Sequence, residues 1–243
     1  MDKQSLLIQG SSWTVGAYQK SDVKSCDDLV PGGIGELASK YFNVTNISVQ
    51  DDFNLGSSWR LNEHLKTTSY DKIIICQNDA LMDVDVLTCD NKEWASNFDF
   101  TLFELKVNKI NSIQKYIEYV LNKFYSQLPS GTFVFAGPSM VINHLAVANK
   151  LVPIQPDWIK CLVPTYQSSF TYSHTKLITL LDILTDLFPK NKFKLKEEFL
   201  LVNDDIDRMI NTWKNNSEYF AYFHPTSLGN KIFFEQILKY LIA

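Results

Sequence analysis

Short apolar runs alternate with amphipathic segments along the whole chain. Four runs of strand length end in glycine or in polar residues, and they cover residues 6–10, 43–49, 70–79 and 131–139. Apolar residues recur at helical spacing in segments that cover residues 33–42, 57–66, 102–128 and 174–188. The strongest helical pattern spans 102–128, where Ile113, Ile117 and Phe124 lie on one side. Residues 218–243 indicate a short strand, a loop and a terminal helix.

This alternation of strands and helices indicates a parallel sheet with helices on both of its faces. The sequence contains no internal repeat, no low-complexity segment and no linker, so we expect one domain over residues 1–243. In such a sheet, ligands bind in the loops that follow the carboxyl ends of the strands. Those loops are therefore where residues with chemical roles are expected.

Composition narrows the classes of function. The chain has 243 residues, of which 45% are hydrophobic, and a net charge of -4. Without a long basic run it is not expected to bind nucleic acid. Without about 18 consecutive apolar residues it is not expected to enter a membrane. The apolar stretch near the N-terminus is too short for a secretory signal, so we expect a cytoplasmic or otherwise soluble protein, or one whose leader was removed before this numbering.

The cysteines form no C-x-x-C pair, which indicates reduced structural thiols rather than a zinc site or a disulfide framework. They are Cys26, Cys76, Cys89 and Cys161.

Residues that suit nucleophilic catalysis follow the predicted strands. Ser11 and Ser12 follow the first strand, Asn78 follows the third, and His224 precedes the terminal helix. A serine nucleophile needs a base for its proton, and histidine is suited to this near neutral pH. The oxyanion needs preorganised donors, which the backbone N–H groups of Ser12 and Gly56 and the side-chain amide of Asn78 would supply.

Taken singly, the same residues have ordinary structural interpretations. A serine after a strand-ending glycine is typical of a turn or a helix N-cap, and Asn78-Asp79 is a common turn pair. His64, His144 and His174 have no motif context, so we expect structural or surface roles for them. Four aspartates do not have the spacing of a calcium loop, and we expect a solvated loop instead. These are Asp79, Asp83, Asp85 and Asp90.

The order of the candidate residues resembles the sequence blocks of the SGNH (GDSL) hydrolase superfamily. Gly10-Ser11-Ser12-Trp13 is similar to the first block, G-D-S-L, which gives the role of nucleophile to Ser12. Gly56 matches the second-block glycine, and Cys76-Gln77-Asn78-Asp79 resembles the third block, G-x-N-D. Ala221-Tyr222-Phe223-His224-Pro225 resembles D-x-x-H-P, which gives the role of base to His224. The likeness spans nearly the whole chain and implies a three-layer α/β/α sandwich of the flavodoxin-like kind.

Three positions depart from the blocks of that superfamily. Ser11 stands in place of Asp, Cys76 in place of Gly, and Ala221 in place of the Asp that would orient the histidine. We therefore expect a Ser12–His224 dyad in which a backbone carbonyl orients the histidine. The alternative is a carboxylate from elsewhere in the chain, and the candidates are Glu218, Asp204, Asp205 and Asp207.

The resemblance implies hydrolysis of an ester through an acyl-enzyme, with no metal or organic cofactor. We expect a small-molecule or carbohydrate ester with a short acyl group, such as acetyl on a sugar, because no long apolar lid segment is apparent. Two other classes remain open: an O-acyltransferase of the same fold, and a non-catalytic SGNH-like module that binds glycans or has a structural role. Several aromatic residues could line a carbohydrate cleft, although core packing explains them equally well. They are Trp59, Trp158, Tyr166, Phe170 and Tyr172.

Overall fold

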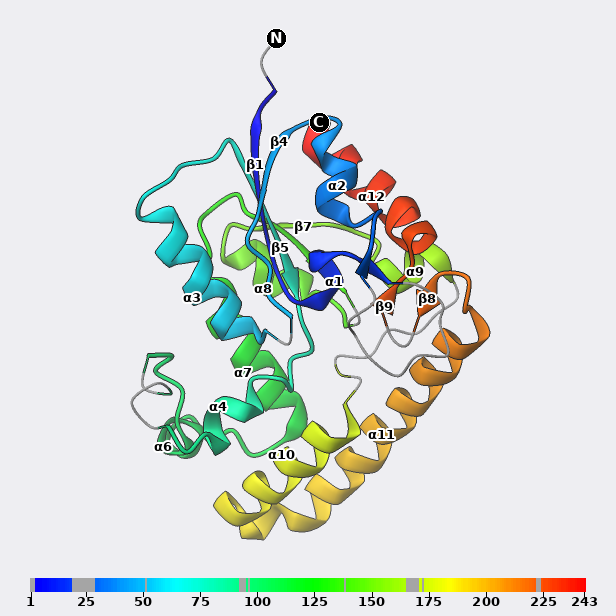
Figure 1. Ribbon diagram of the computed structural model, residues 1–243. Coiled ribbons are helices and arrows are strands. Elements are labelled where there is room, and N and C mark those ends of the chain that lie inside the picture. The colour runs from blue at the N-terminus through cyan, green and yellow to red at the C-terminus, as the bar shows by residue number, and fades with distance from the viewer. Residues whose placement is uncertain are drawn as a thin grey trace.

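The centre of the molecule is a parallel sheet of five strands (Figure 1). The computed structural model describes residues 3–18, 29–50, 52–91, 95, 97–137, 139–164, 171, 173–221 and 224–243. In spatial order the strands are β4 (Asn43–Asn46), β1 (Ser5–Gln9), β5 (Lys72–Gln77), β6 (Phe133–Ala136) and β7 (Val152–Pro153). In order along the chain this is 2-1-3-4-5, the flavodoxin-like arrangement, and every pair is parallel. The predicted fold class is therefore confirmed.

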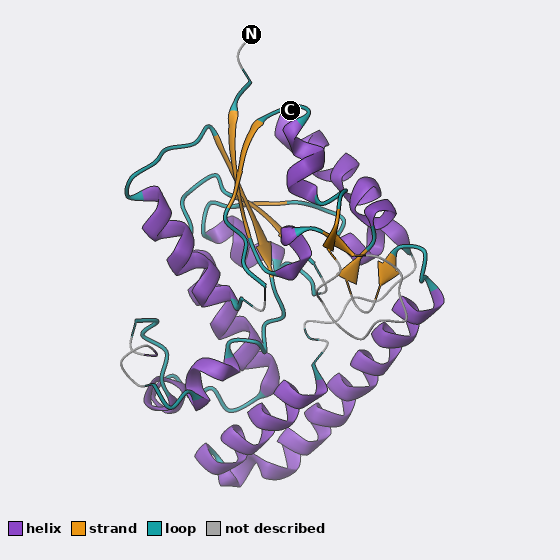
Figure 2. Cartoon of the chain, in the orientation of Figure 1, coloured by secondary structure: helices purple, strands orange, loops and turns teal. Residues whose placement is uncertain are grey.

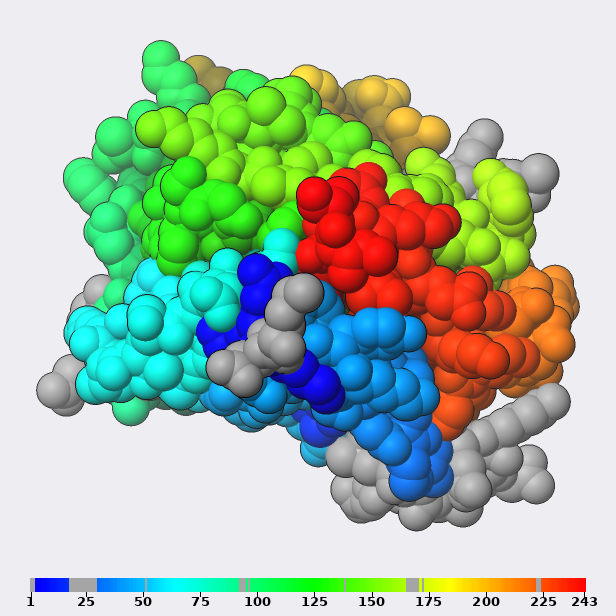
Figure 3. Space-filling view, turned by 90° about the horizontal axis from the view of Figure 1, so that it is seen from above, coloured from blue at the N-terminus to red at the C-terminus, as the bar shows by residue number. Residues whose placement is uncertain are grey.

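Helices cover both faces of the sheet because its strands are apolar on both faces. In β1, Leu6 and Ile8 pack into one hydrophobic cluster and Leu7 into the other. One cluster is covered by α2 (Ile34–Ser39), α9 (Trp158–Leu162) and α12 (Ser227–Ile242). The opposite cluster is covered by α3 (Asn54–Leu65), α7 (Ile113–Ser126) and α8 (Asn143–Ala148). Figure 2 shows the strands between these helices, and Figure 3 shows α12 beside α2 with α3 on the other side of β1.

The remaining elements lie toward the carboxyl end of the sheet. A short helix, α1 (Ser12–Val15), follows β1. Two small antiparallel hairpins are made by β2 (Ala17–Tyr18) with β3 (Leu29–Val30), and by β8 (Phe220–Ala221) with β9 (His224–Pro225). Strand β9 contacts α1, β2 and α12, which places it next to the loop that follows β1. The two hairpins and α1 therefore meet at one place.

A long helical pair extends beyond the sheet (Figure 1). It consists of α10 (His174–Leu187), the short η1 (Pro189–Asn191) and α11 (Lys192–Asn215). The sequence pattern predicts α10 but not α11, because only Leu195, Ile206, Met209 and Trp213 of its 24 residues are buried. In the described part of the chain, no helix, α11 included, is both long enough and apolar enough to cross a membrane.

One prediction about the helices is wrong, and one strand was not predicted. Instead of one helix over 102–128, there are two, α6 (Leu102–Val107) and α7. Lys109 takes a positive φ of 52° between them, and Ser112 then caps α7 by accepting a hydrogen bond from the Lys115 N–H. The periodic pattern continues across the break because Ile110 is buried there as well. The fifth strand, β7, was not predicted because it has only two residues. A further short helix, α4 (Val84–Thr88), follows the loop after β5.

Candidate active site

Ser12 follows the carboxyl end of β1 through a tight turn. Gly10 leaves no room for a side chain, because a Cβ there would lie 2.6 Å from Thr14 Oγ1 and 2.7 Å from Cys76 Cβ of β5. The turn is closed by the N–H and the hydroxyl of Thr14, which both donate to the carbonyl oxygen of Ser11 at 2.9 Å. Ser12 is therefore the first residue of α1, with 9% of its surface exposed.

His224 reaches Ser12 from the other end of the chain. Its Nε2 atom lies 2.9 Å from Ser12 Oγ, across 212 positions of sequence. His224 belongs to β9, where it pairs with Ala221 of β8. The sequence predicted both residues for one site, and the structure brings them to hydrogen-bond distance.

The β8–β9 hairpin is seated on the first turn of α12. A Cβ at Gly229 would lie 2.5 Å from the carbonyl oxygen of Tyr219, so only glycine permits this close approach. Thr226 joins the same parts, because its N–H donates to the Tyr219 carbonyl at 2.9 Å and its hydroxyl donates to the Glu218 carbonyl at 2.7 Å. The backbone next to His224 is therefore set by the start of α12.

Aromatic packing and one buried amide connect this hairpin to α1. The Phe220 ring lies 6.3 Å from the Trp13 ring and 6.2 Å from the Trp213 ring, measured between centroids. Asn230 of α12 is fully buried, and its Nδ2 donates to the carbonyl oxygen of Gly16 at 3.2 Å. Trp13 lies in α1 and Gly16 directly follows it, so the same contacts position Ser12 and His224 relative to each other.

Asn78 follows the last residue of β5 and is held on three sides. Its backbone N–H donates to Asn54 Oδ1 at 2.7 Å, and its side-chain Oδ1 accepts from the Asp79 N–H at 2.8 Å. Its Nδ2 donates to the carbonyl oxygen of Asp52. A side-chain amide carries two N–H donors, so this contact uses one of them. The orientation of the Asn78 amide is thus set by the protein.

Gly56 lies inside the first turn of α3, because this helix begins at Asn54 rather than after Gly56 as the sequence pattern predicted. Backbone N–H groups in a first helical turn have no carbonyl partner within the helix. That of Leu55 donates to Asp83 Oδ1 at 2.9 Å. A Cβ at Gly56 would lie 2.7 Å from Asp52 Oδ1 and 2.9 Å from Phe53 Cζ, so a larger residue there would have to displace these side chains.

A buried carboxylate that the motifs do not contain, Asp52, connects the ends of β1 and β5. Its side chain accepts from Gln9 Nε2 at 3.2 Å and from the Ser57 hydroxyl at 2.8 Å, and Arg60 lies 3.4 Å away. Burial raises the pKa of Asp52, while Ser57 and Arg60 act in the opposite direction. Gln9 ends β1, and Asn78, which follows β5, donates to the Asp52 carbonyl. Asp52 thus contacts both strand ends, a role that depends on pairings far apart in sequence.

The expectation of a solvated loop is wrong for Asp79 and Asp83, which are both fully buried. Asp79 accepts from the Leu81 N–H at 2.7 Å and from the Thr171 hydroxyl at 2.8 Å. Burial raises the pKa of Asp83 to about 7. The carboxylates of Asp79 and Asp83 are therefore part of the buried hydrogen-bond network next to Asn78.

Of the four carboxylates considered as orienting groups for His224, three have other partners and the fourth is exposed. Tyr219 donates its hydroxyl to Glu218, an interaction that raises the pKa of the tyrosine. On α11, Asp205 pairs with Arg208, and Asp207 lies 3.3 Å from His174 Nε2. Asp204 is exposed on the same helix. Ala221 stands directly across the hairpin from His224.

Two of the aromatic residues considered for a carbohydrate cleft, Trp158 and Trp59, are described, and they belong to helices on opposite faces of the sheet. Trp158 is fully buried and stacks on Phe233 with 4.4 Å between ring centroids, so it is a core residue. Trp59 of α3 has 43% of its surface exposed. Tyr166, Phe170 and Tyr172 lie outside the described residues, as do Cys26, Tyr222 and Phe223. A cleft that includes Trp158 is therefore ruled out.

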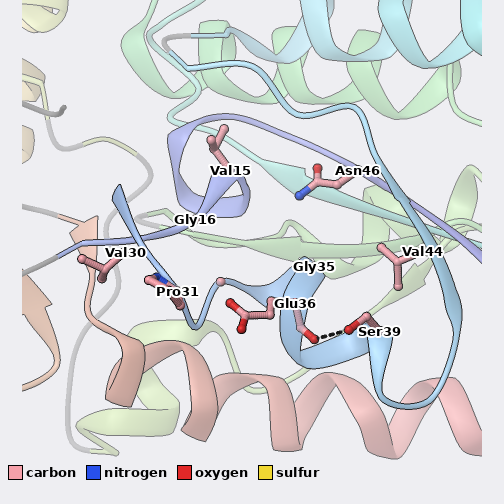
Figure 4. A pocket seen from close by; sticks show the side chains of 10 residues that line it. Val15, Gly16, Val30, Pro31, Gly35, Glu36, Ser39, Val44 and Asn46 are labelled. Atoms are coloured by element: carbon pink, nitrogen blue, oxygen red, sulfur yellow. Dashed lines mark hydrogen bonds between the residues drawn. The ribbon is translucent and has the colours of Figure 1, made fainter. Parts of the chain in front are cut away.

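A cavity of about 500 Å³ lies on the far side of α1 from β5, between the end of α1, β4 and the start of α2 (Figure 4). Its polar groups are bonded within the protein: Glu36 accepts from the Gly32 N–H at 2.6 Å, and Ser39 donates to the Glu36 carbonyl at 2.6 Å. Asn46 donates to the Thr14 carbonyl at 2.8 Å. Among the described residues, neither Ser12 nor His224 lines this cavity, so it is separate from the candidate site.

No family model matches the sequence, and no curated protein matches it. The chain is similar to several solved structures, of which three are described. A lipase/acylhydrolase from Enterococcus faecalis has a TM-score of 0.39 and 12% identity, over 98% of this chain and 95% of the other. LAE5, an alpha/beta hydrolase enzyme from the metagenome of Lake Arreo, Spain, has a TM-score of 0.40 and 11% identity, over 98% and 95%. The psychrotrophic esterase EstA from Pseudoalteromonas sp. has a TM-score of 0.37 and 10% identity, over 99% and 100%. Likeness at this level does not bear on activity, which has to be argued from the site itself.

Proposed function

We propose that this protein is a serine ester hydrolase of the SGNH type, with Ser12 as nucleophile and His224 as base. The observation that carries the proposal is the 2.9 Å contact between His224 Nε2 and Ser12 Oγ. A serine hydroxyl needs an adjacent base to act as a nucleophile, and a histidine within hydrogen-bond distance is the common solution. The substrate class is a small-molecule or carbohydrate ester with a short acyl group.

The two residues divide the reaction into acylation and deacylation. Ser12 Oγ attacks the ester carbonyl carbon while its proton passes to His224 Nε2. The tetrahedral intermediate collapses to an acyl-Ser12 ester, and the departing alcohol takes the proton from His224. Water then attacks the acyl group with His224 again as base, which releases the acid and restores Ser12.

Asn78 is the donor best prepared for the oxyanion. One N–H of its side-chain amide is used by the Asp52 carbonyl, and the other is the one that an oxyanion would accept from. The backbone N–H groups of Ser12 and Gly56 complete the proposed oxyanion hole. Both lie in the first turns of helices, where N–H groups are not used by the helix itself.

A backbone carbonyl is proposed to orient the histidine. For Nε2 to accept the Ser12 proton, the ring must carry its own proton on Nδ1, which a carbonyl can hold in place. A carbonyl does not neutralise the imidazolium that forms in the transition state as a carboxylate would. We therefore expect slower turnover than in an enzyme with a complete triad.

The test is hydrolysis of p-nitrophenyl esters from acetyl to octanoyl, and of an acetylated sugar, by the wild type and the Ser12→Ala variant. We expect turnover of the short esters and its loss in Ser12→Ala, with unchanged circular dichroism. The matched control is Ser11→Ala, the neighbouring serine, which should keep activity. A fluorophosphonate probe should label Ser12 and no other residue, as read by mass spectrometry of the labelled peptide.

The other outcomes identify the other classes. Turnover that appears only with an added sugar acceptor would favour an O-acyltransferase. Absence of both turnover and probe labelling would contradict the proposal and favour a non-catalytic module. Loss of activity in Ser11→Ala with retention in Ser12→Ala would show that the wrong serine has been assigned.

A further inference from the structure

Asp83 is a buried acidic residue whose side chain faces away from the helix that it precedes. It occupies the N-cap position of α4, but within the described structure its side chain makes no capping hydrogen bond to that helix. Its Oδ1 accepts from the Leu55 N–H at 2.9 Å, and its Oδ2 accepts from Asn54 Nδ2 at 2.9 Å. Both carboxylate oxygens therefore bind the start of α3.

Asn54 passes this interaction on to Asn78. It is fully buried, and its Nδ2 donates both to Asp83 and to the carbonyl oxygen of Asp79 at 3.1 Å. Its Oδ1 accepts from the Asn78 N–H at 2.7 Å. Asn54, which lies 24 and 29 positions away from Asn78 and Asp83, thus links them in one chain of hydrogen bonds.

The direction of this chain is set by Asp83 together with the Asp79 carbonyl and the Asn78 N–H, which all require the same orientation of the Asn54 amide. A side-chain amide has a donating end and an accepting end of nearly the same shape, so its neighbours decide which way it faces. An ionised carboxylate only accepts, so Asn54 must turn its Nδ2 toward Asp83 and its Oδ1 toward the Asn78 N–H. The Asp52 carbonyl, which accepts from Asn78 Nδ2, lies two residues before Asn54 in the same segment.

We infer that Asp83 and Asn54 are positioning residues that hold the Asn78 amide in the orientation required to bind the oxyanion. The inference rests on the proposed function of Asn78. The two residues do not touch the reacting atoms, and they act through the backbone and side chain of Asn78. A displacement of about 1 Å at such a group can lower the rate by about 10²-fold.

The ionisation of Asp83 sets the conditions for a test. Burial raises its pKa to about 7, with a further contribution from the charge of Asp52, so an assay at pH 8 keeps it mostly ionised. The titratable groups around it are Asp52 with its partner Arg60, Asp79, the buried Tyr116 of α7, and Asp85 with its partner Lys176 of α10.

The experiment is a cycle of three variants of the full chain at pH 8. In Asp83→Asn an amide must meet two donors, so we expect kcat to fall about 10- to 100-fold while KM stays within about twofold. In Asn54→Asp two carboxylates would face each other, and the loss should be larger. The exchanged pair, Asn54→Asp with Asp83→Asn, restores an acceptor for both the Leu55 N–H and the Asn78 N–H. It should recover part of the kcat, because a carboxylate at position 54 still leaves the Asp79 carbonyl without the donor that Asn54 supplies. The control is Asp85→Asn, which removes a carboxylate from α4 without touching Asn54.

A second measurement keeps the inference separate from the proposed function. Hydrogen exchange of the Asn78 backbone N–H, followed by NMR, should be slow in wild type, faster in Asp83→Asn and slow again in the exchanged pair. This result is expected even if the protein hydrolyses no ester. The inference would be overturned if the exchanged pair recovered neither kcat nor protection, or if Asp83→Asn raised KM and left kcat unchanged.

Discussion

Ser12 and Asn78 follow the carboxyl ends of neighbouring strands in a five-stranded parallel sheet, whereas His224 lies on a hairpin of two-residue strands. On the sheet side, buried polar groups such as Asp52, Asn54 and Asp83 hold the strand ends through hydrogen bonds. On the hairpin side, the position of His224 depends on a glycine contact and on aromatic packing. The two residues of the dyad are therefore held in place by different kinds of contact. Damage to the sheet side should affect stability and rate together, and damage to the hairpin side should affect mainly the rate.

The largest effect is expected from Asn78→Ala on the sheet side. Loss of one oxyanion donor lowers turnover by about 10²- to 10³-fold. The same change removes the side-chain bond to the Asp52 carbonyl, so the melting temperature should fall as well. Steady-state kinetics and thermal denaturation measure the two effects. A rise in KM with kcat preserved would place Asn78 outside the oxyanion hole.

The substitution Gly229→Ala tests the hairpin side. A methyl group there collides with the Tyr219 carbonyl, so the β8–β9 hairpin and His224 should shift relative to Ser12. We expect kcat to fall about 10-fold or more with only a small change in melting temperature, because a displaced general base loses its geometry. Leu228→Ala, at an exposed position in the same turn, is the control. Equal stability losses in Gly229→Ala and Asn78→Ala would contradict the comparison.

Ala221→Asp should strengthen the hairpin side. Residues directly opposite in an antiparallel pair have Cβ atoms about 4.5–5.5 Å apart, so a carboxylate at position 221 would lie beside the His224 ring. We expect kcat to rise several-fold, because the carboxylate would stabilise the imidazolium. Glu218→Gln is the companion measurement and should change kcat little, since Glu218 is bonded to Tyr219. A large loss in Glu218→Gln would show that a carboxylate already orients the histidine.

The smallest effect concerns stability against pH on the sheet side. The pKa of Asp83 is about 7 in the folded protein, against about 3.9 for an unfolded chain. Between pH 3.9 and pH 7 the folded state therefore binds more protons at Asp83 than the unfolded state does. The stabilising contribution of protonated Asp83 is complete at low pH and is lost as the pH rises through about 7. Urea denaturation between pH 5 and pH 8 should show a steeper decline for wild type than for Asp83→Asn. Parallel curves would mean that Asp83 does not titrate in this range.

The sequence was sufficient for the fold class and for the Ser12–His224 pair, but not for the groups that support them. Strand runs are local patterns, and Ser12, Asn78 and His224 each lie in a short block of a few residues. Both kinds of pattern can be recognised in a single sequence. The bonds from Asp83 to Asn54 and from Asn54 to Asn78 join positions 29 and 24 residues apart, and no spacing rule relates them. The loop pattern predicted that the aspartates between positions 79 and 90 are exposed to solvent, whereas tertiary hydrogen bonds bury two of them. In the same way, a periodic pattern could not reveal the positive φ of Lys109 that divides the helix expected over 102–128.

Because Gly10 packs closely against Cys76, the reactivity of the Cys76 thiol depends on whether the ends of β1 and β5 stay together. Cys76 is fully buried one residue before Gln77, and burial raises the pKa of its thiol well above the usual range. Alkylating reagents react with thiolates, so this sulfur does not react until the end of the central strand β5 becomes exposed. Cys89 and Cys161 are more accessible and would be modified first. The slow rate at which iodoacetamide then captures Cys76 would measure how often the strands that carry Ser12 and Asn78 separate in the native protein.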